Sequence, residues 1–186
     1  WLLVLLVPSI SMRLWAEERK TGSIELLMTL PITSLEAVIG KFIAAWLMIA
    51  VALILTFPIW VTINILGNPD NGVVISSYLG SWLLAGQFLA IGSALSAMTK
   101  NQVIAFVVST AACFVFVMSG LETVTQALEG WMPSYILLAV DTMSSLDYFE
   151  EFTKGIIDAR AIVFYITTIV FWLFINVVVI NLKKAK

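Results

Sequence analysis

Residues 161–182 read AIVFYITTIVFWLFINVVVINL, a stretch without one charged side chain. A helix needs about 20 apolar residues to cross roughly 30 Å of hydrocarbon, so this stretch is long enough to span a bilayer. Inside lipid every backbone N–H and C=O must be paired within the protein, which restricts spanning segments to helices and closed barrels. The stretch lacks the apolar–polar alternation of barrel strands. We therefore predict a transmembrane helix here.

Similar apolar runs occupy residues 1–10, 38–66, 73–98 and 103–121. The chain is 61% hydrophobic and 12% charged, whereas a soluble domain is about half apolar and about a quarter charged. A soluble fold of this size could not bury so much apolar surface. We predict an all-α fold, a polytopic transmembrane helix bundle that forms one domain over residues 1–186.

The expected segments follow from these runs and from the polar residues between them. They are a partial helix 1–10, a polar segment 11–33, membrane helices 34–66, 75–98, 103–121 and 160–182, and an outer segment 122–159. The first residue is Trp1, inside an apolar run without a charged flank, so we expect the sequence to begin within a helix. Thr33 and Glu36 have the spacing of a capping box. Pro58 is expected to kink helix 34–66, either as a packing feature or as a gating hinge.

Basic residues separate to one side of the predicted bundle. If segment 11–33 is cytoplasmic, alternation of the spans leaves only Lys154 and Arg160 outside. The basic residues inside are then Arg13, Arg19, Lys20, Lys41, Lys100, Lys183, Lys184 and Lys186. Cytoplasmic loops of membrane proteins carry an excess of Lys and Arg. We therefore expect the Arg13–Lys41 loop, the turn at Lys100 and the carboxy terminus to face the cytoplasm.

Two further patterns concern packing and the outer segment. Gly86, Ala90, Ala94 and Ala97 form a stripe of small residues, which suits either close packing within the bundle or a dimer or pathway-lining face. In the outer segment, the apolar run 133–140 is too short to span and is expected to be re-entrant or interfacial. Residues 145–158 have the pattern of an amphipathic helix. The apolar residues of that helix are Leu146, Phe149, Phe152 and Ile156.

Several chemistries are excluded by composition. The sequence has no histidine and only one cysteine, Cys113, so a histidine-dependent triad, a zinc site and a disulfide are not available. It has no GxxxxGK[ST] phosphate loop, so the chain is not predicted to hydrolyse ATP. The predicted spans hold no clear ionisable residue, which disfavours an ion-coupled carrier. We expect no catalytic residues, metal or cofactor here, and any transport energy to come from another subunit.

The polar segment has a more specific pattern. Residues 12–31 read MRLWAEERKTGSIELLMTLP. Gly22 interrupts a first short helix, Ser23 can cap a second, Glu25 lies in its first turn, and Pro31 ends it. Helices this short are unstable alone in water. The pair must therefore lie on the membrane surface or dock against a partner protein.

This segment resembles the signature of permease subunits of the type-2 ABC exporter family, EE-x-x-x-G-[ST]-[IL]-E-L-L-x-T-x-P. The matching residues are Glu17, Glu18, Gly22, Ser23, Ile24, Glu25, Leu26, Leu27, Thr29 and Pro31. The motifs GKF at 40–42, SYLG at 77–80, TKNQ at 99–102 and GIIDAR at 155–160 are similar to the gliding-motility-associated and copper-enzyme-maturation branch. That family has six membrane helices, so the sequence would lack the first helix and part of the second.

The resemblance implies a permease in the bacterial cytoplasmic (inner) membrane that works with a second permease subunit and a separate ATP-binding subunit. ATP and Mg²⁺ would bind that partner, and no nucleic acid is implied. In this family the segment seats in a cleft of the ATP-binding subunit, and segment 122–159 caps the exit side of the pathway. A solvated, purely structural lid is an equal alternative for segment 122–159. The implied docking residues are Glu17, Glu18, Arg19, Lys20, Gly22 and Glu25, with Ile24 and Leu27 packing beneath.

Two alternatives to transport remain open at this stage. The chain could be a non-transporting scaffold that anchors an ATPase in a motility or envelope-assembly machine. Alternatively, the short helices could lie on the membrane surface without a partner, with Arg19 and Lys20 snorkelling. The transported substrate is not readable from the sequence, because helices lined by Ser, Thr, Asn, Trp and Phe suit many amphipathic molecules.

Overall fold

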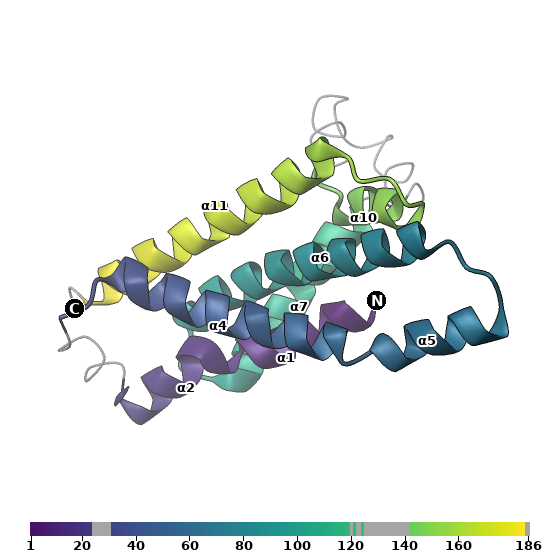
Figure 1. The fold of residues 1–186 in the computed structure, drawn as a ribbon. Helices are drawn as coiled ribbons and strands as arrows, with labels where there is room; N and C mark the ends of the chain where they lie inside the picture. The colour runs from purple at the N-terminus through teal and green to yellow at the C-terminus, as the bar shows by residue number, and fades with distance from the viewer. Residues whose placement is uncertain (24–30, 120, 122–123, 125–141, 185–186) are drawn as a thin grey trace.

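The computed structural model describes residues 1–23, 31–119, 121, 124 and 142–184. All regular structure within these residues is α-helical, which confirms the predicted fold class. The helices are α1 (Leu2–Ser11), α2 (Arg13–Thr21), α4 (Ser34–Ile54), α5 (Phe57–Leu66), α6 (Asn71–Met98), α7 (Gln102–Met118), α10 (Ser145–Thr153) and α11 (Ala159–Lys184). Figure 1 shows them as an elongated bundle, with α2 at one end and α10 at the other.

Helix α6 forms the centre of the bundle and contacts α1, α2, α4, α7, α10 and α11. Of its most apolar window, 61% is buried, whereas only 17% is buried in each of the outer segments 34–66 and 159–183. The outer helices thus turn most of their apolar side chains away from the protein. This arrangement suits lipid, in which exposed apolar surface carries no penalty.

Three helical segments are long and apolar enough to cross a membrane, among the residues described: 34–66, 71–98 and 159–183. The apolar helix α7 is shorter, at 17 residues. The amphipathic α2 and α10 lie at the two ends of these segments (Figure 1). The lengths and positions therefore describe a bundle with two polar ends and an apolar middle.

The small-residue stripe of α6 faces other helices of the same chain. Ala90, Ala94 and Ala97 are buried, and Gly86 lies against Trp46 of α4. Gly92 approaches α1 so closely that an added Cβ would lie 2.0 Å from the hydroxyl oxygen of Ser11. Of the two interpretations of the stripe, packing within the bundle is therefore the one observed.

The predicted single helix 34–66 is wrong, because residues 55 and 56 separate it into α4 and α5. Pro58 has no N–H to continue the hydrogen-bond ladder and is accommodated in the first turn of α5. The hydroxyl of Thr56 donates to the carbonyl of Leu53 at 2.6 Å and pairs with the Tyr78 hydroxyl at 2.7 Å. These bonds fix a break where the sequence predicted only a kink.

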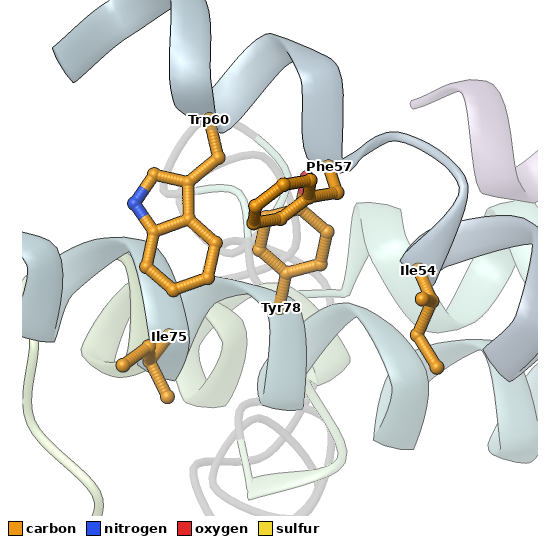
Figure 2. Close-up of a pocket in the computed structure, with 5 residues that line it drawn as sticks. All are labelled: Ile54, Phe57, Trp60, Ile75 and Tyr78. Atoms are coloured by element: carbon orange, nitrogen blue, oxygen red, sulfur yellow. The ribbon is translucent and has the colours of Figure 1, made fainter.

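Beside this break, α4, α5 and α6 line an open apolar pocket of about 240 Å³. Figure 2 shows its lining of Ile54, Phe57, Trp60, Ile75 and Tyr78. Helix α5 itself has no buried residue. The second half of the apolar segment 34–66 is therefore only loosely attached to the bundle.

Other boundaries differ from the prediction because side chains cap the helices. Helix α6 begins at Asn71, since the Asp70 carboxylate accepts the N–H of Gly72. Helix α7 ends at Met118, where the Ser119 hydroxyl donates to the Phe116 carbonyl. The Asp158 carboxylate accepts the N–H of Arg160, so that α11 begins at Ala159.

Helix α10 is shorter than the predicted amphipathic helix 145–158. It ends at Thr153, and Gly155 has φ 81°, a conformation that a helix cannot contain. Phe152 is buried as expected, but Ile156 lies beyond the helix and is exposed. The apolar run 133–140 is outside the described residues.

Charged residues collect at the two ends of the bundle. We call them the α2 end, where α2 and the last turns of α6 and α11 meet, and the α10 end, where α10 and the first turn of α6 meet (Figure 1). Basic residues at the α2 end are Arg13, Arg19, Lys20, Lys41, Lys100, Lys183 and Lys184, with Glu17, Glu18 and Glu36. Asp70, Asp147, Glu150, Glu151 and Asp158 lie at the α10 end, with Lys154 and Arg160. The two ends therefore differ in charge as the sequence predicted.

The capping box before α4 is present. The Thr33 hydroxyl accepts the N–H of Glu36 at 3.2 Å, and the Glu36 carboxylate accepts the N–H of Thr33 at 2.7 Å. Thr33→Ala should destabilise the protein by about 1 kcal/mol, because one orphan N–H loses its acceptor. Equilibrium unfolding in detergent micelles measures this. Thr167→Ala, which removes only a bond within α11, is the control, and an equal loss in both variants would contradict the prediction.

Candidate functional site

Helix α2 is a short amphipathic helix with one buried and one exposed face. Trp15 and Ala16 are fully buried. We call Arg13, Glu17, Lys20 and Thr21, all exposed, the exposed face of α2. The helix ends at Gly22, whose φ of 76° is left-handed and disfavours other residues. The predicted interruption at Gly22 is confirmed.

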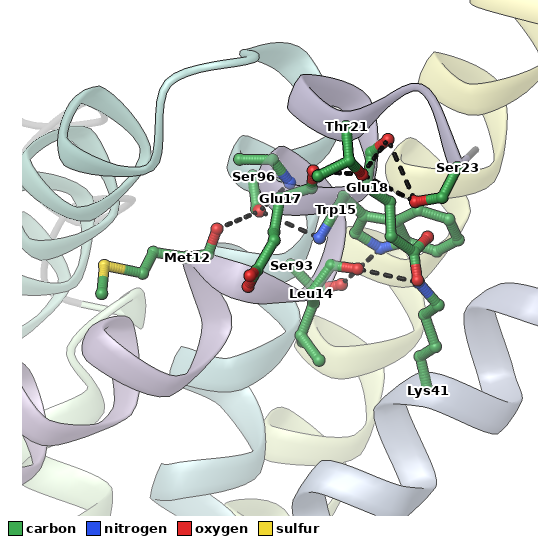
Figure 3. Close-up of polar contacts among 11 residues, drawn as sticks. Met12, Leu14, Trp15, Glu17, Glu18, Thr21, Ser23, Lys41, Ser93 and Ser96 are labelled. Atoms are coloured by element: carbon green, nitrogen blue, oxygen red, sulfur yellow. Dashed lines mark hydrogen bonds and ion pairs between the residues drawn. The ribbon is translucent and has the colours of Figure 1, made fainter.

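Trp15 is the buried anchor of α2, as Figure 3 shows. Its indole Nε1–H donates to the Ser93 hydroxyl of α6 at 3.2 Å. The same hydroxyl accepts from the Asn176 amide of α11 at 2.7 Å. Because all three side chains are fully buried, these bonds are shielded from water. Trp15 thus connects α2 with two membrane-crossing helices.

Ser96 of α6 supplies the cap that α2 lacks in its own sequence. Met12 precedes α2 and offers no side-chain acceptor for the free N–H groups of the first turn. The Ser96 hydroxyl accepts the N–H of Trp15 at 3.3 Å and that of Ala16 at 3.1 Å, and donates to the Met12 carbonyl at 2.9 Å. One hydroxyl can accept two bonds and donate one. The start of α2 is therefore fastened to α6.

A charged contact attaches α2 to α4. The Lys41 ammonium forms an ion pair with Glu18, donates to the Leu14 carbonyl at 2.8 Å and lies 4.1 Å from the centroid of the Trp15 ring. The two charged side chains are 20% and 29% exposed, so water screens the pair only partly. Lys41 therefore completes a three-sided attachment of α2 to α4, α6 and α11.

Two cations meet at the carboxyl end of α6. The Arg19 guanidinium donates to the Ala97 carbonyl, which also accepts from the Lys183 ammonium at 3.1 Å. Lys183 donates to the Met98 carbonyl at 2.6 Å. Positive charge is favourable at the negative end of a helix dipole. Partial burial lowers the pKa of Arg19, but an arginine side chain stays charged in proteins.

The predicted docking residues fall into three groups. Glu17, Lys20 and Gly22 are exposed and accessible to a partner. Glu18 and Arg19 point into the fold, where Lys41 and the Ala97 carbonyl hold them. The remaining three, Ile24, Glu25 and Leu27, lie outside the described residues. Of the predicted docking residues on α2, only some are therefore accessible to a partner.

The attachment residues Trp15, Lys41, Ser93, Ser96 and Asn176 were not among the predicted site residues. The sequence did contain one indication that Trp15 is buried, since Trp15 is a large apolar residue in a helix otherwise rich in charge. Ser93 and Ser96 are three residues apart on α6 and thus share a face. No pattern in the neighbouring sequence relates these two serines to α2, which is about 80 residues earlier.

The described contacts of α2 form a binding surface. The described residues contain no group of three His, Cys, Asp or Glu side chains that could hold a metal ion. Cys113 is buried.

Comparison with known families decides the class. The family model described as ABC-2 family transporter protein matches residues 1–182. The chain belongs to this family. ABC-2 permeases are membrane components of ABC transporters, do not themselves catalyse ATP hydrolysis, and generally work with an ATP-binding subunit. This ABC-2 chain is accordingly a multi-pass membrane permease. No curated protein and no solved structure gives a significant match.

Proposed function

We propose that this ABC-2 permease is an exporter subunit driven by a separate ATP-binding subunit that docks on the exposed face of α2. The permease would line the translocation pathway together with a second permease subunit. ATP and Mg²⁺ would bind the ATP-binding subunit only. The single observation that carries the docking surface is the geometry of α2, which presents one charged face outward while the other face is fastened to the bundle.

The attachment of α2 supports a role in transmitting movement. A nine-residue helix is not stable by itself. Here Trp15 and Arg19 hydrogen-bond to α6 and Glu18 pairs with Lys41 of α4, while Glu17 and Lys20 remain exposed. A partner that moves the exposed face of α2 would therefore move the bundle as well.

The distribution of charge supports the orientation. We propose that the basic α2 end faces the cytoplasm, where the ATP-binding subunit is found, and that the acidic α10 end faces outward. The membrane would be the bacterial cytoplasmic membrane. The motifs at 40–42, 77–80, 99–102 and 155–160 favour the gliding-motility-associated and copper-enzyme-maturation branch as the nearest type of permease.

Charge reversal on the exposed face of α2 tests the docking surface. Glu17→Arg and Lys20→Glu together should weaken binding of the ATP-binding subunit by about tenfold, which corresponds to about 1.4 kcal/mol. Co-purification and a binding titration in nanodiscs measure this. Lys154→Glu reverses an exposed charge at the α10 end and should leave binding unchanged. Undiminished binding and ATPase stimulation in the double variant would refute docking at this face.

The scaffold alternative makes the same docking prediction but differs in whether cargo moves. The whole complex, reconstituted in vesicles, should show ATP-dependent movement of an amphipathic cargo across the bilayer. If the complex binds its ATPase but moves none of the envelope and small-molecule candidates, an anchoring role replaces transport.

A further inference from the structure

We propose that α2, α6 and α10 move as one unit, so that displacement of α2 at one membrane surface repositions α10 at the other. Ser96 and Trp15 form the joint between α2 and α6. This inference rests on the proposed function in one respect, namely that the ATP-binding subunit acts on α2. It adds the path of the movement and the residues that transmit it.

The joint at the α2 end is made of directed, buried bonds. Ser96 holds both the backbone start of α2 and the Met12 carbonyl, and Ser93 holds the Trp15 side chain. A shift of α2 along or across α6 would leave several of these groups without partners in a region that excludes water. Such groups are costly to expose to an apolar environment. The favourable movement is one in which α6 follows α2.

A second buried joint connects α6 with α10 at the opposite end. The Ser76 hydroxyl of α6 donates to the Phe152 carbonyl at 2.7 Å, and the Ser145 hydroxyl of α10 donates to the Gln87 side-chain oxygen at 2.9 Å. The Phe152 side chain packs against Gly80 so closely that a Cβ added at Gly80 would lie 2.6 Å from the Phe152 Cβ and 2.7 Å from its ring. The outer helix is therefore seated directly on α6.

Helix α6 is continuous between the two joints. It is one uninterrupted α-helix of 28 residues and contains no proline. Helix α11 braces both joints, through Asn176 at Ser93 and through the Tyr165 hydroxyl, which donates to the Ser145 carbonyl at 2.8 Å. The segment that starts with α4 is interrupted at residues 55 and 56. Among the described helices, α6 and α7 both contact α2 and α10, and side chains of α6 also hydrogen-bond to both, which makes α6 a direct mechanical route between them.

The experiment measures a response at α10 while the partner acts at α2. Thr153→Cys places an exposed thiol on α10, and the natural Cys113 is buried and gives little background. The maleimide labelling rate is measured in nanodiscs with the ATP-binding subunit bound, in the absence of nucleotide and in the vanadate-trapped state. In the otherwise unaltered permease, trapping should change the rate by about fivefold or more, within the ordinary range of coupling between sites.

The joint variants are Ser96→Ala, which removes a hydroxyl with little change of shape, and Trp15→Phe, which keeps an aromatic ring but removes the indole N–H and part of the ring system. Each should reduce the trapping response at position 153 while the ATP-binding subunit still binds. Ser96→Thr keeps a hydroxyl and should recover the response. Ser77→Ala is the matched control, because its hydroxyl bonds only to the Val73 carbonyl of the same helix. The melting temperature is recorded for every variant.

The outcomes separate the two proposals. A response that persists unchanged in Ser96→Ala and Trp15→Phe, even with a lowered melting temperature, means that the joint is only structural and overturns the inference. An unaltered permease that binds its partner but shows no response at position 153 also overturns it and leaves the proposed function standing. Failure of the unaltered permease to bind would overturn the proposed function and this inference together.

Discussion

Replacing Trp15 by alanine should lower the free energy of unfolding by about 3–5 kcal/mol, the range for a fully buried large side chain. Trp15 is 0% exposed, and its ring contacts Lys41 while its N–H binds Ser93. The variant loses apolar burial and also leaves the Ser93 hydroxyl and the Lys41 ammonium with fewer partners. Equilibrium unfolding in mixed micelles, followed by far-UV circular dichroism, measures the change.

Trp1→Ala is the matched control, because that tryptophan is 67% exposed and its removal should change stability by only a few tenths of a kcal/mol. Trp15→Phe should lie between the two, since it keeps an aromatic ring but not the N–H. Equal stability of Trp15→Ala and Trp1→Ala would show that α2 is not anchored through this residue.

Gly92→Ala should cost about 1–3 kcal/mol, as is usual when a packed core is overfilled. The added methyl group would lie 2.0 Å from the Ser11 Oγ and 2.7 Å from its Cβ. Ser11 is fully buried, so α1 must move away from α6 to admit the methyl group. The same unfolding measurement applies, and reduced packing of α1 should also increase proteolysis near the amino terminus.

Ser11→Gly in the Gly92→Ala background should restore part of the loss, because it removes the atoms that clash. A double-mutant cycle then gives a favourable coupling energy between positions 11 and 92. Gly40→Ala is the control. A Cβ at this position meets nothing within 4 Å, and the substitution replaces a glycine inside a helix by alanine. It should stabilise the protein by about 0.5–1 kcal/mol. Additive effects at positions 11 and 92 would contradict the close approach.

The features that were predictable from sequence depend on nearby residues. Thr33 and Glu36 are three residues apart, so their spacing alone predicts the capping box that the structure contains. Gly22 similarly ends α2 by a local preference. The all-α fold followed from the length and composition of the apolar runs. In each case the physical cause lies within a few residues or within one segment.

The contacts of the buried side of α2 could not be predicted, because the residues that it contacts are distant in sequence. Glu18 and Arg19 belong to a charged motif, yet their exposure depends on where Lys41 and the end of α6 lie. Ser96 caps a helix that begins 83 residues earlier, at Arg13, and no spacing rule relates them. The break before α5 could not be predicted either, since it is held partly by the hydroxyl of Tyr78, on the distant helix α6, which pairs with the Thr56 hydroxyl.

The central position of α6 has a consequence for biogenesis. Its mean hydropathy in the most apolar window is 1.4, whereas segments 34–66 and 159–183 reach 2.5. An isolated helix partitions from the translocon into lipid according to such values, so α6 gains the least by entering the bilayer alone. Ser76, Gln87, Ser93 and Ser96, which organise the two joints, are polar residues of this helix. Stable insertion of α6 is therefore linked to the insertion of the helices that pack against it. The polar residues that connect the two membrane surfaces thus also make membrane integration cooperative.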